Sequence, residues 1–222
     1  NKVMNTLLLM LTEKYNARVA DIQGGSLRNA IPRESFVTVT VPEKYADQLL
    51  AYIPEFEEVV KEQFAAVEPD MSITAAPTEM PAKVMDKETI ANVIEAVAKY
   101  PNGVIAMSKD FEGTVETSSN LAIVKLVDGQ IMTASLQRSL VDASKEELAE
   151  KMRKLLENCG AKAESSGSYP GWKPNVNSVI YNTMKKVYED KYGKTPKTMV
   201  IHAGLECGIL GTKYPNWDMV SF

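Results

Sequence analysis

The 222-residue sequence contains few of the side chains from which metal and disulfide sites are built. It has one histidine, His202, and two cysteines, Cys159 and Cys207. Two cysteines are too few for a disulfide framework, so we expect a reducing, cytoplasmic setting. One histidine and two distant cysteines also cannot assemble a zinc site of the usual histidine-rich kind. The sequence therefore predicts no metal site within these residues.

Long apolar runs and a strong excess of one charge are absent too. The longest apolar run, residues 7–11, is far shorter than the roughly 20 residues that a membrane-spanning helix needs. No basic segment precedes this run, so we expect no signal peptide. Lysine and arginine total 25 and aspartate and glutamate 29, giving a net charge of −4, which disfavours a broad nucleic-acid surface. Hydrophobic residues make up 45% of the chain, enough for a sizeable core.

Both ends of the sequence are unusual. The chain starts at Asn1 directly in a helical pattern, and residues 218–222 are typical of an incomplete strand. We expect both ends to be cuts through a larger protein.

Apolar spacing predicts a mixed helix and strand fold. Helices are expected over 3–14, from Glu43, from Pro54, and over 87–99, 144–158 and 176–192. Strands are expected over 17–23, 35–41, 71–75, 114–127, 130–138, 161–168 and 197–201. Asp86 is expected to cap one helix, Ser144 with Glu147 another, and Asp128-Gly129 predicts a two-residue hairpin.

The order helix–strand–strand–helix–strand occurs twice, over 3–76 and 87–168. This order predicts an α+β fold of two tandem units, each with an antiparallel sheet covered by helices on one face. The segment 165–174 is rich in Gly, Pro and Ser, which is typical of a domain boundary. The helix and strand expected after it indicate the edge of an α/β domain.

Four segments carry candidate functional residues. The loop 24–32 offers Arg28, which could bind a carboxylate, and Asn29, which could donate to a developing oxyanion; a plain hairpin loop is the favoured alternative. Arg138 at the end of a strand could present a bidentate fork to a carboxylate, although a surface ion pair, for example with Asp142, is commoner. The turn 169–172 could cover a pocket or pack a linker. The cluster 145–147 is expected to be a solvated helix face.

The fourth segment, 201–208, contains His202, Glu206 and Cys207 between glycines. His202 and Glu206 are four residues apart, which is a weak metal signal, so a structural polar contact is the simpler interpretation. Cys207 could be a nucleophile, but no basic partner is evident and a buried thiol is simpler.

Together these segments resemble one family. The carriers are Gly-Gly-Ser-Leu-Arg-Asn-Ala-Ile-Pro-Arg-Glu at 24–34, Gln-Arg-Ser at 137–139, Tyr-Pro-Gly-Trp at 169–172 and His-Ala-Gly-Leu-Glu-Cys-Gly at 202–208. Their types and order resemble the aminoacyl-histidine dipeptidases, also called Xaa-His or cytosol non-specific dipeptidases, of the dinuclear-zinc exopeptidase superfamily. Such enzymes have an α/β catalytic domain with two zinc ions and an inserted lid domain.

The resemblance implies that 1–169 form most of the lid and that 170–222 return into the catalytic domain. It implies hydrolysis of Xaa-His and other dipeptides by an intact parent, and a homodimer through the lid. It places the zinc ligands and the general-base glutamate outside this chain, so we expect the chain alone to be inactive and to hold no zinc.

Residue by residue, the resemblance implies four substrate-binding positions. Asn29 matches a lid asparagine near the substrate carbonyl, and Arg138 matches the arginine that binds the substrate's C-terminal carboxylate. Glu206 and Gly208 match the loop beside the active site. A non-catalytic dimerisation module remains the alternative function. A cysteine enzyme using Cys207 with His202 is a weaker one.

Overall fold

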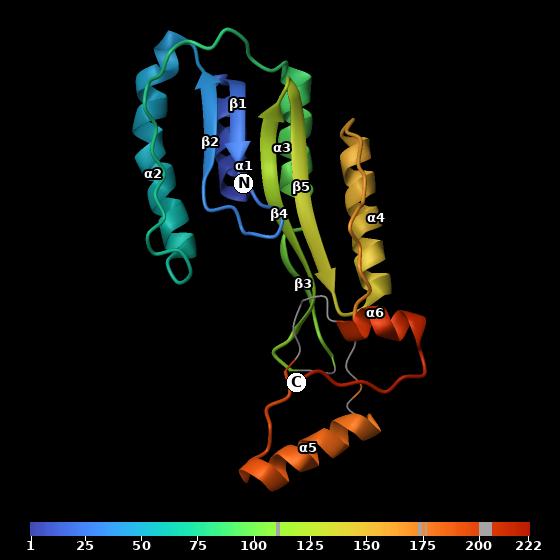
Figure 1. The fold of residues 1–222 in the computed structure, drawn as a ribbon. Coiled ribbons are helices and arrows are strands. Elements are labelled where there is room, and N and C mark those ends of the chain that lie inside the picture. Colours follow the sequence, from blue (N-terminus) through green and yellow to red (C-terminus); the bar gives the residue numbers. More distant parts are fainter. Residues whose placement is uncertain (110–111, 173–174, 176, 200–205) are drawn as a thin grey trace. The chain divides into compact units, whose positions relative to one another are not determined.

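A computed structural model of the protein describes residues 1–109, 112–172, 175, 177–199 and 206–222 (Figure 1). The chain divides into two units. Unit 1 consists of Asn1–Tyr100, Asn120–Leu136 and Leu155–Ala161, and unit 2 of Pro101–Ser119, Gln137–Lys154 and Lys162–Phe222. Each unit is described by itself.

The elements follow in the order α1 (Lys2–Tyr15), β1 (Arg18–Gly24), β2 (Ser35–Thr40), the 3-10 helix η1 (Glu43–Tyr45), α2 (Ala46–Phe64), α3 (Lys87–Lys99), β3 (Gly103–Met107), β4 (Val115–Val127), β5 (Gln130–Ser139), α4 (Asp142–Asn158), α5 (Val179–Tyr192) and α6 (Glu206–Lys213). Strands β1 and β2, β1 and β4, and β3 and β4 pair in antiparallel orientation. The predicted class, helices with an antiparallel sheet, is therefore confirmed.

Unit 1 is built around the amphipathic helices α1 and α2. Their buried faces form one apolar cluster, which consists of Leu7, Leu11, Tyr15, Ala17, Leu49, Ile53, Phe56 and Val60. The sequence predicts that a second helix begins at Pro54, but α2 is continuous through this residue. Pro54 lies on the exposed side, where water can replace the lost backbone hydrogen bond, while Ile53 and Phe56 hold both halves of the helix to the core.

The sheet of unit 1 combines strands that are joined by a loop, by a long connection and by one tight turn. β1 pairs with β2 from Arg18↔Thr40 to Gly24↔Ser35, and β1 pairs with β4 at Gln23↔Lys125 and Gly24↔Val124. β5 pairs with β4 through the predicted Asp128-Gly129 turn, in which both residues have positive φ, 50° and 78°. This is the geometry that two-residue hairpins prefer.

Helix α3 lies beside α1 behind the sheet (Figure 1) and is tied at both ends. At its start, the Asp86 carboxylate accepts the Thr89 backbone N–H at 2.8 Å, so the predicted cap is confirmed. At its end, the Lys2 ammonium donates to the carbonyls of Val97 and Tyr100, each at 2.6 Å. A cation at this end also complements the helix dipole.

Unit 2 combines β3 with the N-terminal half of β4, from Gly103↔Ser119 to Met107↔Val115. Leu148 and Met152 form the buried face of α4. The Ser178 side chain caps α5, and Gly193 ends it with φ 65°. The Asp218 carboxylate accepts the Ile180 N–H at 3.0 Å, so the C-terminal segment is tied to the start of α5.

Several predicted strands are wrong in detail. Residues 71–75 form no strand, although Met71 and Ile73 do pack on the core of unit 1. Apolar and polar residues alternate here as in a strand, but this segment forms no hydrogen-bonded pairing with another strand. Residues 161–168 are mostly exposed and irregular, and residues 218–222 are not a strand. Of the predicted strand 197–201, residues 197–199 are irregular and 200–201 lie outside the described residues.

Two further differences concern unit 2. Strand β3 has no counterpart among the predicted strands, because it is only five residues long and its exposed residues become a strand only by pairing with β4. Helix α4 begins at Asp142, two residues before the predicted cap Ser144.

Candidate functional site

The loop that carries Asn29 is fixed to β4 in unit 1. Gly25 has φ 77°, and a Cβ there would lie 1.8 Å from the carbonyl oxygen of Ala122. Only glycine allows this approach. Further along the loop, the Asn120 side-chain amide donates to the carbonyl of Ala30 at 2.8 Å. Asn29 itself is exposed, so the loop is anchored on both sides while the Asn29 amide faces solvent.

Arg138 lies at the end of β5, in unit 2, and is half-buried. The strand end around it is held by two contacts. The hydroxyls of Thr117 and Ser139 are 2.9 Å apart, and the Leu140 N–H donates to the Glu116 carbonyl at 3.0 Å. A guanidinium on a fixed strand end can present its planar fork to a carboxylate in one orientation.

The turn 169–172 packs against this strand end. A Cβ on Gly171 would lie 3.0 Å from the Leu140 carbonyl oxygen and 3.1 Å from that of Ser139. The Gly171 N–H donates to the Asp142 carboxylate at 2.9 Å, and the Lys145 ammonium donates to the Tyr169 carbonyl at 2.5 Å. The turn is therefore bonded to the first residues of α4.

Asp142 and Lys145 also bond to each other, at 2.7 Å. Partial burial raises the pKa of the Asp142 carboxyl, but hydrogen bonds from Lys145 and from the Gly171 N–H, with the Lys145 charge, outweigh it and leave the pKa lowered. The carboxylate is thus held in its charged form. Of the cluster 145–147 that was expected on a solvated helix face, Glu146 and Glu147 are exposed, but the Lys145 side chain is only 16% exposed.

Helix α6 contacts the same turn through Gly208. This glycine is buried, and a Cβ on it would lie 2.9 Å from the Pro170 carbonyl oxygen. Glu206, at the start of α6, is exposed, and Cys207 is half-buried. His202 lies outside the described residues, so its predicted contacts stay predictions.

Three of the four motifs therefore meet in unit 2: the strand end with Arg138, the turn 169–172 and the start of α6. Asn29 belongs to unit 1. Sequence reasoning missed the residues that hold these motifs. The sequence suggests for Asp142 only an ion pair with Arg138, and the structure instead bonds its carboxylate to the Gly171 N–H. The sequence gives no signal for Asn120, because a single amide in a strand has no recognisable partner until the neighbouring loop is placed.

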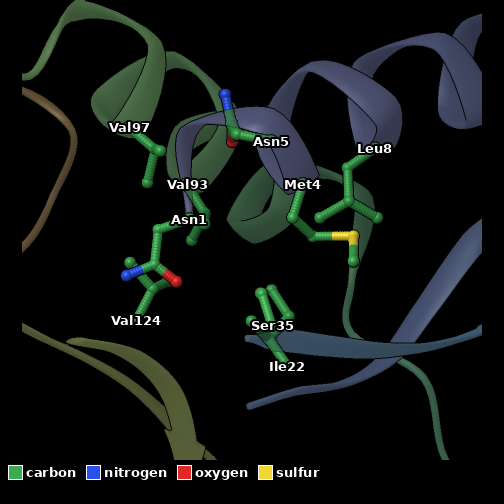
Figure 2. A pocket seen from close by; sticks show the side chains of 9 residues that line it. All are labelled: Asn1, Met4, Asn5, Leu8, Ile22, Ser35, Val93, Val97 and Val124. Carbon is green, nitrogen blue, oxygen red and sulfur yellow. The ribbon is translucent and has the colours of Figure 1, made fainter. Parts of the chain in front are cut away.

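The cavity drawn in Figure 2 lies elsewhere, between α1, α3 and the sheet of unit 1. It is lined by Asn1, Met4, Asn5, Leu8, Ile22, Ser35, Val93, Val97 and Val124. Its internal space is about 10 Å³, close to the minimum for a single water molecule. The Asn1 side-chain oxygen is buried without a hydrogen-bond partner among the described residues, and a single water could bond to it. A space of this size is too small for a dipeptide, so the cavity is not a substrate site.

Metal-binding clusters and membrane-spanning helices are both absent from the described residues. No group of three or more His, Cys, Asp or Glu side chains there could hold a metal ion. No helix in the described part of the chain is long and apolar enough to cross a bilayer.

Comparison with known proteins confirms the resemblance to the aminoacyl-histidine dipeptidases over the whole chain, although no family model matches. One relative is a cytosol non-specific dipeptidase of Escherichia coli (strain K12), 35% identical over 224 residues, which are 100% of this chain and 46% of that protein. The other is the crystal structure of aminoacylhistidine dipeptidase from Vibrio alginolyticus. It is 38% identical with a TM-score of 0.95, over 100% of this chain and 45% of that one. The chain thus spans about half the length of the relatives it matches.

Proposed function

We propose that this chain is the substrate-clamping part of a dipeptidase that hydrolyses Xaa-His and other dipeptides. The observation that carries the proposal is the TM-score of 0.95 to an aminoacylhistidine dipeptidase over the entire chain. The contacts that bring the Arg138 strand end, the turn 169–172 and α6 together within unit 2 agree with it, since these are the motifs on which the resemblance rests.

The proposed work of the chain is binding and orientation. Arg138 forms a bidentate ion pair with the C-terminal carboxylate of the dipeptide, which selects substrates with a free C-terminus. Asn29 donates its amide to the substrate carbonyl, where negative charge develops during hydrolysis. Glu206 and Gly208 border the bound substrate. Residues 1–169 form most of the lid, and 170–222 belong to the catalytic domain.

Zinc enters this proposal through the parent enzyme alone. The described residues offer no suitable group of ligands, so the two zinc ions implied by the resemblance do not fit them. We infer that the ligands come from the remaining half of a full-length dipeptidase, which acts in the cytoplasm. No step of this chain's own chemistry passes through the metal.

Hydrolysis of a small set of Xaa-His dipeptides, with and without added zinc, tests the division of labour. The 222-residue chain is expected to show no turnover under either condition. A chimera in which this chain replaces the matching part of the E. coli dipeptidase is expected to hydrolyse the same dipeptides. Zinc-dependent turnover by the chain alone would place the ligands within it and contradict the domain assignment.

A dimerisation module is the second candidate function. Strand β3 favours it, because Val104 and Met107 are 58% and 50% exposed on a short apolar strand. Sedimentation of the chain over a range of concentrations tests this function. Association that is unaffected by zinc and lost in Val104→Lys supports it, and a monomer at all concentrations contradicts it.

A further inference from the structure

Lys145 and Asp142 connect two elements that are distant in sequence. Through Lys145 Nζ and Asp142 Oδ1, the first turn of α4 bonds to both the Tyr169 carbonyl and the Gly171 N–H. The ammonium also lies 5.9 Å from the centre of the Tyr169 ring. An ordinary ion pair three residues apart on an exposed helix contributes little. Here each partner uses a second bond to satisfy the backbone of the turn.

Close backbone contacts connect this turn both to the end of β5 and to α6. Gly171 lies against the Ser139 and Leu140 carbonyls, directly after Arg138 in the chain. On the other side, Gly208 of α6 lies against the Pro170 carbonyl. Neither glycine leaves room for a side chain, so a shift of the turn must move the strand end, α6 or both.

We propose that Asp142 and Lys145 are positioning residues that lock the turn 169–172 onto the end of β5 and, through Gly208, fix the start of α6. The link from this lock to substrate rests on the proposed function. In that function, the lock keeps Arg138 and the Glu206–Gly208 segment at the fixed separation that a dipeptide requires. Neither Asp142 nor Lys145 touches the substrate.

Hydrogen exchange of the 222-residue chain tests the lock without any need for activity. Asp142→Asn keeps the shape of the side chain but removes its charge, and Lys145→Met removes the donor. In both variants the backbone N–H groups of Ser168, Tyr169, Gly171 and Trp172 should exchange about tenfold faster, as expected for the loss of a hydrogen bond to a charged group. Lys145→Arg, which can donate to both partners, should restore protection.

Lys154→Met is the matched control. Lys154 lies on the same helix and forms an ion pair with Glu150 at 3.3 Å, with its side chain 66% exposed. It should leave exchange in the turn unchanged. Amides of the β1–β2 ladder report in every variant whether the chain remains folded. Unchanged protection of 168–172 in a folded Asp142→Asn chain would overturn the lock.

Titration of the same variants with an Xaa-His dipeptide separates the two proposals. If the wild-type chain binds and Asp142→Asn binds several-fold more weakly, both hold. If the turn loosens but the dissociation constant is unchanged, the positioning role is wrong while the proposed function stands. If the wild-type chain binds no dipeptide, the proposed function fails, and the exchange data still decide the lock.

Discussion

The loop that carries Asn29 and the turn 169–172 that packs beside the Arg138 strand end are held in place by different forces. The Asn29 loop is fixed by the close approach of Gly25 to β4 and by one neutral amide, that of Asn120. The turn 169–172 is fixed by a charged pair, Asp142 and Lys145, together with close glycine contacts. Steric and neutral contacts are insensitive to pH, whereas a carboxylate bond is not. The loop in unit 1 is therefore expected to be insensitive to pH, whereas the turn in unit 2 is expected to respond to the protonation of Asp142.

The largest effect is expected from filling the space at Gly25. Gly25→Ala would place a Cβ 1.8 Å from the Ala122 carbonyl oxygen at a positive φ. The loop must then leave β4, and the free energy of unfolding should fall by about 3 kcal/mol. Urea unfolding measures this change.

Gly193→Ala is the control for the Gly25 substitution. Gly193 also has a positive φ, 65°, but a Cβ there would have nothing within 4 Å. Gly193→Ala should lower the free energy of unfolding by only about 1 kcal/mol, because it adds backbone strain without a steric clash. Equal losses in both variants would show that the contact with Ala122 does not hold the loop.

The corresponding change at the turn is smaller. In Gly208→Ala, the new methyl group would meet the Pro170 carbonyl oxygen at 2.9 Å, so the chain should lose about 1 kcal/mol despite the better helix propensity of alanine. Gly211→Ala in the same helix meets only the flexible Met219 methyl at 3.4 Å and should be neutral or stabilising. Thermal unfolding of the pair gives the comparison, and a stabilised Gly208→Ala chain would contradict the packing of α6 on the turn.

Removing the neutral amide should loosen the Asn29 loop selectively. Asn120→Asp cannot donate to the Ala30 carbonyl, and the loss of about 1 kcal/mol corresponds to roughly fivefold faster tryptic cleavage at Arg28 and Arg33. Asn182→Ala is the control, because the Asn182 amide donates to the carbonyl of Ser178, the residue that caps its own helix. Unchanged cleavage in Asn120→Asp would mean that the glycine contact alone anchors the loop.

The smallest effect concerns acid pH and distinguishes the two segments. The pKa of Asp142 is lowered in the folded chain, so its contribution is present above the ordinary aspartate pKa and is lost as the pH falls through the lowered value. Protection of the turn should therefore decrease below about pH 4 in the wild type and show no such step in Asp142→Asn. The Asn29 loop should show no step that depends on Asp142. A step shared by both segments would point to general acid unfolding.

Local patterns predicted much of the fold. The Asp86 cap, the helices at 3–14 and 87–99 and the Asp128-Gly129 hairpin follow from side-chain chemistry within a few residues, and each is found. The strand at 71–75 failed because strand formation needs a partner that sequence alternation does not supply. The same limit hid β3, whose exposed residues become a strand only by pairing with β4.

The candidate site divides in the same way. Arg138 and Gly208 could be selected because their motifs resemble a known family, and the structure brings their segments together. Asp142, Lys145 and Asn120 could not, because their partners are backbone atoms of the turn and the loop, and a backbone carbonyl leaves no mark in a sequence. Lys145 in particular reads as a surface lysine until the Tyr169 carbonyl is placed beside it.

The most direct test of the central claim is an NMR titration of the 222-residue chain with an Xaa-His dipeptide and with its C-terminal amide. The account predicts that the dipeptide shifts resonances around Arg138 and the turn 169–172. The wild-type chain should bind the C-terminal amide more weakly than the free dipeptide. In Arg138→Lys, which keeps the charge but not the planar fork, this preference for the free carboxylate should be lost. Arg153→Lys, on the solvent-facing ion pair with Glu150, should change nothing. Equal binding of dipeptide and amide, or no shifts at these residues, would contradict the claim.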